Sequence, residues 1–93
     1  MFHQRFQLSA VFKQPYIYVF GGRFFGANVS NRLANCERYN TKTKKWIMIG
    51  SLNIPRAQAT AFIAKDKIYV AQGSQNNEFL EYYDEKTNKW NFT

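Results

Sequence analysis

Few residues of this sequence could do covalent or metal chemistry. It has one cysteine, Cys36, and one histidine, His3, which lies near the start of the chain. A catalytic cysteine needs a histidine and an acidic partner, and a metal site needs a cluster of His, Cys or acidic residues. Neither pattern occurs, and no Gly-x-Ser-x-Gly or phosphate-loop motif is present. We therefore expect no enzyme activity, no cofactor and no metal, and we expect Cys36 to be a small buried residue.

The composition limits the class of protein further. Hydrophobic residues make up 45% of the 93 residues and aromatic residues 18%, which argues against a disordered chain. No apolar run approaches the roughly 18 residues of a membrane-spanning helix, and the first ten residues lack a signal-peptide core. A lone cysteine cannot form an internal disulfide, so we expect a protein of the cytoplasm or nucleus with no membrane partner.

The sequence repeats itself. When the segment 5–22 is placed over 56–73, seven of 18 positions are identical; when 35–46 is placed over 79–90, six of 12 are identical. No gap is needed within either segment, and the difference in spacing is confined to the loop between them. Such a pattern indicates two copies of one structural unit.

Each copy is expected to form four short strands. The ranges are 7–12, 16–20, 35–39 and 45–49 in the first copy, and 58–64, 67–71, 79–83 and 89–93 in the second. The second strand of each copy is apolar at nearly every position, as is typical of a strand covered on both faces. The expected fold is therefore all-β, with two four-stranded antiparallel sheets over residues 5–50 and 56–93, the last strand being cut short.

Glycine and tryptophan residues occur at corresponding positions of the two copies. Gly21–Gly22 ends the second strand of the first copy, where glycine allows a sharp turn with positive φ. The second copy has Gln72–Gly73 there, so we expect a less extreme turn. Trp46 and Trp90 open the two fourth strands, and we expect each ring to pack between neighbouring sheets.

Together these residues resemble the kelch repeat over nearly the whole chain. The family pattern is an apolar run ending in two glycines, then a Glu-Arg-Tyr-Asp-like segment, then a tryptophan. The matching residues here are Gly21, Gly22, Tyr39 and Trp46 in the first copy and Gly73, Tyr83 and Trp90 in the second. The resemblance implies two blades of an incomplete β-propeller and a non-catalytic protein-binding role, often as the substrate-recognition part of a ubiquitin-ligase adaptor.

A closed propeller takes about four to eight blades. Two units leave one sheet face uncovered on each side. The sequence therefore leaves three alternatives: a fragment of a longer protein with further blades, association of two or three copies to complete a ring, or a short product that is only marginally stable.

An up-and-down sheet places its turns and its longer loops at opposite ends. We name these ends the turn face, which carries the turns between strands one and two and between strands three and four, and the loop face, which carries the remaining connections. All eight lysines map to the turn face or its rim, whereas four of the five arginines, Arg5, Arg23, Arg32 and Arg56, map to the loop face. Arginine suits bidentate recognition of carboxylate and phosphate, so we expect the loop face to bind a protein or peptide that is acidic or phosphorylated.

The candidate binding residues lie in the two loops after the glycines. They are Arg23, Phe24, Phe25, Asn28, Asn31 and Arg32 in the first loop, and Ser74, Gln75, Asn76 and Asn77 in the second. Arg23 and Ser74 follow the glycine positions, where the family resemblance implies ligand contact. The main alternative is a cytoskeletal, actin-type binding or scaffold role. A third and weaker one is nucleic-acid binding through the basic faces, which is disfavoured because the tyrosines fall at expected core positions.

Overall fold

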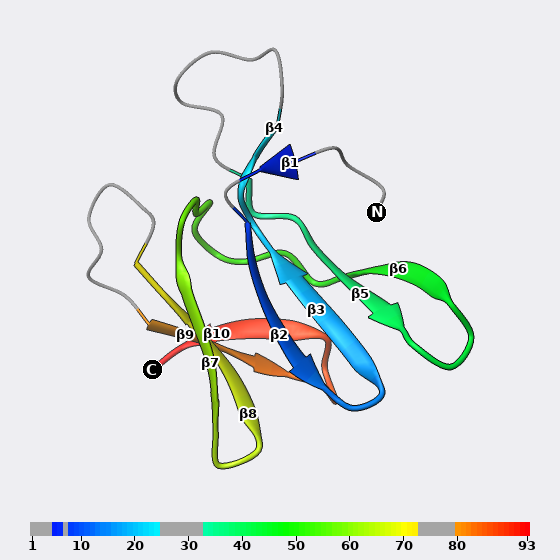
Figure 1. Cartoon of the computed structure of the whole chain (residues 1–93). Coiled ribbons are helices and arrows are strands. Elements are labelled where there is room, and N and C mark those ends of the chain that lie inside the picture. The colour runs from blue at the N-terminus through cyan, green and yellow to red at the C-terminus, as the bar shows by residue number, and fades with distance from the viewer. Residues whose placement is uncertain (1–4, 7, 25–32, 73–79) are drawn as a thin grey trace.

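The computed structural model describes residues 5–6, 8–24, 33–72 and 80–93, and these form strands joined by turns and loops (Figure 1). The first four-stranded sheet has the order β2-β3-β5-β6, with bounds β2 Ser9–Lys13, β3 Tyr16–Phe20, β5 Cys36–Asn40 and β6 Lys45–Ile49. The second has the order β7-β8-β9-β10, with bounds β7 Thr60–Ala64, β8 Lys67–Ala71, β9 Leu80–Asp84 and β10 Lys89–Phe92. All neighbouring strands in both sheets are antiparallel.

The two sheets repeat the same register. Phe20 at the end of β3 lies opposite Cys36 at the start of β5, and Ala71 at the end of β8 lies opposite Leu80 at the start of β9. Both loop connections therefore leave from the same end of their sheets, which is the loop face. The prediction of two four-stranded antiparallel sheets is confirmed, and each sheet has the form of one propeller blade.

A small additional sheet was not predicted from the sequence. β1, Arg5–Phe6, pairs antiparallel with β4, Arg23–Phe24, just beyond the end of β3. The residues of β4 had been expected to begin a loop. A two-residue ladder is too short to show the period-two alternation by which strands are recognised.

The core lies between the two blades. Tyr18 and Phe20 of β3 face Ile68 and Val70 of β8, and all four side chains are at most 1% exposed. Phe20 meets Trp90 edge to face, with ring centroids 5.3 Å apart. Because period-two alternation directs these side chains from both sheets to one layer, the apolar contact joins the blades into one unit.

The expectation that both tryptophans pack between sheets is confirmed for Trp90. The Trp90 ring is 4% exposed and lies in the core, where it also contacts Tyr83. Trp46 lies on the opposite face of the first sheet and contacts Tyr39 with centroids 5.1 Å apart. For Trp46 it stays a prediction, because among the described residues no second four-stranded sheet packs on that side of the first blade.

Hydrogen bonds join the residue that follows β6 to the start of β10. The Trp90 Nε1–H donates to the Gly50 carbonyl oxygen at 2.9 Å, and the Gly50 N–H donates to Asn88 Oδ1 at 2.7 Å. A Cβ at position 50 would lie 2.1 Å from the Asn88 carbonyl oxygen, so this close approach requires glycine. The Tyr83 hydroxyl donates to the same Asn88 Oδ1 at 2.6 Å.

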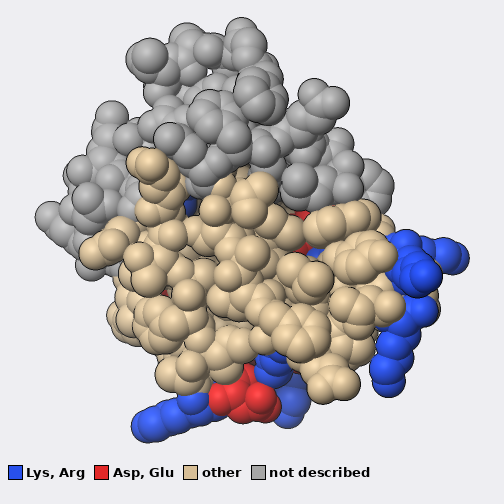
Figure 2. Space-filling model, in the orientation of Figure 1, with Lys and Arg blue, Asp and Glu red and all other residues tan. Residues whose placement is uncertain are grey.

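Charged side chains are unevenly spread over the surface. In Figure 2, basic side chains gather at the right, by the β5–β6 turn of Figure 1, and along the lower edge, where acidic side chains lie beside them. The surface between these regions carries few charges in this view. The described residues contain no helix that is long and apolar enough to cross a membrane.

Burial of Tyr83 makes stability depend on alkaline pH. Burial raises the pKa of the Tyr83 phenol to about 12 from its ordinary value of 10.0. As the pH rises above 10.0, the unfolded chain loses this proton before the folded chain does, so the free energy of unfolding falls until about pH 12. We predict that Tyr83→Phe costs about 1 kcal/mol at neutral pH through the lost hydrogen bond and reduces the alkaline loss.

Urea unfolding followed by tryptophan fluorescence at neutral and alkaline pH measures both effects. Part of the fall in the free energy of unfolding at alkaline pH should persist in Tyr83→Phe, because burial also raises the pKa of Tyr18. An alkaline loss of the same size in the parent chain and in Tyr83→Phe would contradict this assignment.

Candidate functional site

The base of the first loop is built on the two glycines after β3. Gly21 and Gly22 have φ values of 59° and 93°, which favour glycine. A Cβ on Gly21 would lie 2.4 Å from the Arg56 carbonyl oxygen and 3.0 Å from that of Leu33. The glycine therefore allows the segment that leads into the second blade to pass directly against the end of the first.

Backbone hydrogen bonds join these segments at the loop face. The Gly22 N–H donates to the Arg56 carbonyl oxygen at 2.7 Å, and the Arg56 N–H donates to the Leu33 carbonyl oxygen at 2.9 Å. The Leu33 N–H in turn donates to the Gly22 carbonyl oxygen at 2.8 Å. The start and end of the first blade's loop are thus held together and fixed to the chain entering the second blade.

The side chain of Arg56 forms a buried ion pair with Glu81 of β9. Arg56 is 1% exposed and Glu81 is fully buried. The Arg56 Nε and the Arg56 Nη2 both lie 3.0 Å from Glu81 Oε2, and the Asn53 N–H donates to Glu81 Oε1 at 2.7 Å. Arg56 Nη1 donates to the Gln72 carbonyl oxygen at 2.7 Å. Hydrogen bonds to both Glu81 oxygens offset the cost of removing these charges from water.

This burial corrects the expected role of Arg56. The sequence placed Arg56 among the arginines of a binding face, but its guanidinium is enclosed and supplies no charge to the surface. The sequence did contain a signal for the pair. Arg56 and Glu81 are identical to the aligned Arg5 and Glu37 of the first copy, and Glu37 is also fully buried. Glu37 and Glu81 each lie opposite a buried valine in the ladder, and a charged residue repeated at such a position indicates a buried pair rather than a surface contact.

Gln72, directly after β8, has the same left-handed conformation as Gly21 after β3. Gln72, the residue aligned with Gly21, has φ 66°, which is close to the 59° of Gly21. The expectation that losing one glycine makes the turn less extreme is therefore wrong at this position. The Gln72 carbonyl oxygen accepts from Arg56, and this contact favours the left-handed conformation despite its steric cost for a side chain.

The predicted partner-binding residues fall largely beyond what the structure describes. It places Arg23 and Phe24 in β4, at the start of the first loop, with Arg23 opposite Phe6 and Phe24 opposite Arg5 in the ladder. The other eight predicted residues lie outside the described residues, as does Gly73: Phe25, Asn28, Asn31, Arg32, Ser74, Gln75, Asn76 and Asn77. Their role as binding residues stays a prediction.

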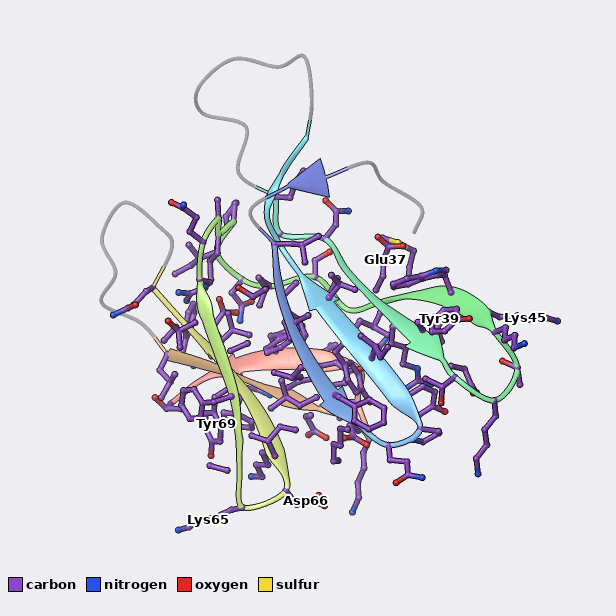
Figure 3. All side chains as sticks on the ribbon, in the orientation of Figure 1. Glu37, Tyr39, Lys45, Lys65, Asp66 and Tyr69 are labelled. Carbon is purple, nitrogen blue, oxygen red and sulfur yellow. The ribbon has the colours of Figure 1, made fainter. Side chains whose placement is uncertain are left out.

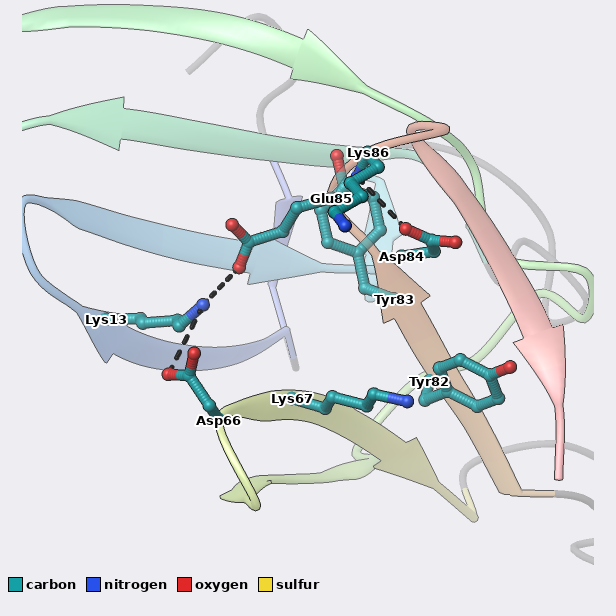
Figure 4. Close-up of a pocket in the computed structure, with 8 residues that line it drawn as sticks. All are labelled: Lys13, Asp66, Lys67, Tyr82, Tyr83, Asp84, Glu85 and Lys86. Carbon is teal, nitrogen blue, oxygen red and sulfur yellow. Dashed lines mark hydrogen bonds and ion pairs between the residues drawn. The ribbon is translucent and has the colours of Figure 1, made fainter.

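A groove of about 400 Å³ opens at the turn end of the second blade (Figure 4). It is lined by three lysines, three acidic residues and two tyrosines: Lys13, Lys67, Lys86, Asp66, Asp84, Glu85, Tyr82 and Tyr83. The lysines and acids balance in number, so the groove carries no net charge. Sequence reasoning treated these lysines as solvated and did not predict the groove.

The charges of the groove neutralise one another across the two blades. The Lys13 ammonium donates to Glu85 and lies 3.6 Å from Asp66 Oδ1, which joins the β2–β3 turn to two turns of the second blade. The hydrogen bond to Glu85 raises the pKa of Lys13 above its ordinary value. The Lys67 ammonium lies 4.8 Å from the centre of the Tyr82 ring, a cation–π contact. This arrangement fits a structural contact between blades better than a site for an anionic ligand.

The residues first considered for chemistry do not form a reactive site in the described part of the chain. Cys36 is fully buried as a free thiol in the core, as predicted. Among the described residues, no group of three or more His, Cys, Asp or Glu side chains is placed to hold a metal ion.

Comparison with known proteins identifies the repeat. The profile of the kelch motif matches residues 4–53, more than half of the chain. The chain belongs to the kelch repeat family.

Two kelch relatives from Rattus norvegicus match with different coverage. Kelch-like protein 7 is 41% identical over 70 residues, and the protein named Kelch repeat and BTB domain-containing protein 8 is 29% identical over 76 residues. These matches cover 70% and 82% of this kelch chain, and each spans only 12% of the relative.

A solved structure supports the fold of the kelch chain. The structure of YjhT superimposes with a TM-score of 0.80 at 22% sequence identity, over 96% of this chain and 37% of that one. The two sheets are thus two adjacent blades of a partial kelch propeller. The family and fold support a protein-interaction module.

The buried Arg56–Glu81 pair gives the sharpest stability prediction of this site. Arg56→Met leaves the Glu81 carboxylate buried without its partner, and we expect a loss of about 3–5 kcal/mol in the free energy of unfolding. The double variant Arg56→Met/Glu81→Leu should recover most of this loss, because it leaves no buried charge. Chemical denaturation monitored by circular dichroism measures both.

Lys13→Met is the matched control, because it removes a cation from a partly exposed ion pair. We expect it to cost at most about 1 kcal/mol. If Arg56→Met were no more damaging than Lys13→Met, or if the double variant were no more stable than Arg56→Met, the pair would not have the role assigned to it.

Proposed function

We propose that the chain is a non-catalytic recognition module whose loop face binds an acidic or phosphorylated peptide of a protein partner. The observation that carries this proposal is the difference between the two faces. Two of the three lysines that line the turn-face groove are already engaged, Lys13 by Glu85 and Lys67 by the Tyr82 ring. At the loop face, the sequence places Arg23 and Arg32 at the two ends of the longer loop.

The base of that loop supports the proposal because it is rigidly held. Gly22 and Leu33 are fixed by backbone hydrogen bonds to the Arg56 segment, and Arg56 is itself fixed by Glu81. A loop whose ends are held loses less conformational entropy on binding than a free one. Arginine and phenylalanine are both enriched at protein interfaces relative to the rest of the protein surface.

A role in a ubiquitin-ligase adaptor is a finer part of this proposal. It rests on the family and on relatives such as the one whose name records both kelch repeats and a BTB domain. Within such an assembly, this chain would supply the recognition half and another domain would supply the link to the ligase.

A charge-reversal experiment tests the loop face. The variant Arg23→Glu/Arg32→Glu is compared with Lys42→Glu/Lys45→Glu, which makes the same change in net charge at exposed residues of the turn face and its rim. The probes are a pool of fluorescent phosphoserine peptides, the same pool without phosphate, and a lysine-rich pool, each titrated by anisotropy.

We expect the parent chain to favour the phosphoserine pool, followed by the pool without phosphate. The arginine variant should bind the phosphoserine pool at least about tenfold more weakly, whereas the lysine variant should bind it as the parent does. Equal weakening in both variants would indicate attraction by net charge alone. Unchanged binding in the arginine variant would place the site elsewhere, and either result would overturn the proposal.

A further inference from the structure

The alternation of side chains gives each blade a second face that points away from the core. On the first blade this face carries Phe12, Tyr39, Trp46 and Met48, and we call it the first outer face. On the second blade it carries Phe62, Tyr69 and Tyr82, and we call it the second outer face. Figure 3 shows Tyr39 and Tyr69 on opposite sides of the molecule, Tyr39 beside β5 and β6 and Tyr69 beside the second blade.

Both outer faces expose large apolar side chains. Phe12 is 58% exposed and Met48 is 40% exposed on the first outer face, and Phe62 is 41% exposed on the second. Phe62 stacks on Tyr69 with centroids 5.3 Å apart, and Tyr69 contacts Tyr82 at 6.1 Å, so the second outer face carries a row of three rings. These exposed apolar side chains are available for contact with another protein surface.

Each outer face resembles one side of the interface that joins the two blades in the core. In the core, Tyr18 of the first blade meets Tyr83 of the second with centroids 6.1 Å apart. The residue aligned with Tyr18 is Tyr69 on the second outer face, and the residue aligned with Tyr83 is Tyr39 on the first outer face. Trp46 is likewise aligned with the core residue Trp90. The first outer face therefore resembles the inner face of the second blade, and the second outer face resembles the inner face of the first.

The substitutions between the two halves conserve size. The Phe20 ring, which packs on Trp90, is replaced by Ala71 on the second outer face, and Val11 on the adjacent strand is replaced by Phe62. Tyr16 and Arg38 are likewise replaced by Lys67 and Tyr82, so two aromatic rings are lost and two are gained on the same face. The Ser9 hydroxyl, which donates to the Ala59 carbonyl oxygen across the core interface, is replaced by the Thr60 hydroxyl. The number of aromatic rings and one hydroxyl donor of the interface are both retained.

We propose that this chain associates with further copies of itself head to tail, the second outer face of one copy packing on the first outer face of the next. The two faces differ from each other and match across copies, so the contact is heterologous, and such contacts close into rings when the rotation allows. Since propellers close with about four to eight blades, two to four copies of a two-blade chain would complete one. This association uses surfaces separate from the peptide-binding loop face.

The oligomeric state of the 93-residue chain tests the proposal. We expect light scattering and sedimentation to show a mass above the 11.0 kDa of one chain, rising over about a hundredfold range of concentration. A parent chain that stays monomeric throughout that range would overturn the proposal and would indicate that further blades of a longer protein cover the outer faces instead.

Two single variants and their mixture test the geometry. Met48→Glu places a charge on the first outer face and Phe62→Glu places one on the second, both at exposed positions. Each variant alone should be monomeric. An equimolar mixture should form a one-to-one dimer of twice the monomer mass, because the first variant keeps an intact second outer face and the second variant keeps an intact first outer face.

Ile47→Glu is the control. Ile47 is 45% exposed and adjacent to Met48, but its side chain points to the other face of the sheet, so this variant should associate as the parent does. A variant that still forms dimers alone would indicate a symmetric contact between like faces. That result, or a mixture that stays monomeric, would overturn the head-to-tail proposal.

Discussion

The enclosed ion pair between Arg56 and Glu81 is the contact on which the architecture of this chain depends. An arginine and a glutamate removed from water are costly, and the cost is offset only when both are fully hydrogen-bonded. Here the carboxylate accepts from Arg56 and from the backbone of Asn53, and the guanidinium also reaches the Gln72 carbonyl oxygen. The backbone of Arg56 meanwhile bonds to Gly22 and Leu33 of the first blade. One residue thereby fixes both blades and the ends of both loop connections.

The two blades show how a repeat conserves contacts while exchanging residues. In the first blade, the Arg38 guanidinium lies 4.1 Å from the centre of the Tyr16 ring. The aligned pair in the second blade is Tyr82 and Lys67, in which the cation and the ring have changed places and still make contact. Because the diagonal relation between neighbouring strands is the same in both sheets, either arrangement satisfies it. The geometry of the blade, rather than the identity of each residue, is what the repeat preserves.

Much of the fold could be predicted from the sequence because the same residue pattern occurs in both copies. The four strands of each sheet, the central position of Tyr18 and Val70, and the burial of Cys36 follow from apolar patterning that occurs twice. The short β1–β4 ladder could not be predicted, because two residues carry no periodicity. The burial of Arg56 was missed for a different reason: net-charge reasoning treats every arginine as exposed, and the repeated arginine and glutamate that indicate the pair were not weighed against it. The left-handed conformation of Gln72 accompanies a tertiary hydrogen bond from Arg56, which local propensity does not contain.

The central claim is that the loop base of the first blade and the entry to the second form one cooperative unit. Native-state hydrogen exchange of the Gly22, Leu33 and Arg56 amides tests this most directly, since the Gly22 and Arg56 amides donate across that junction and the Leu33 amide closes the loop base. The account predicts that they exchange as slowly as the central amides of β3 and β8, through global unfolding. If they exchanged as fast as the amides of the exposed β5–β6 turn while the strands stayed protected, the junction would open independently and the claim would be contradicted.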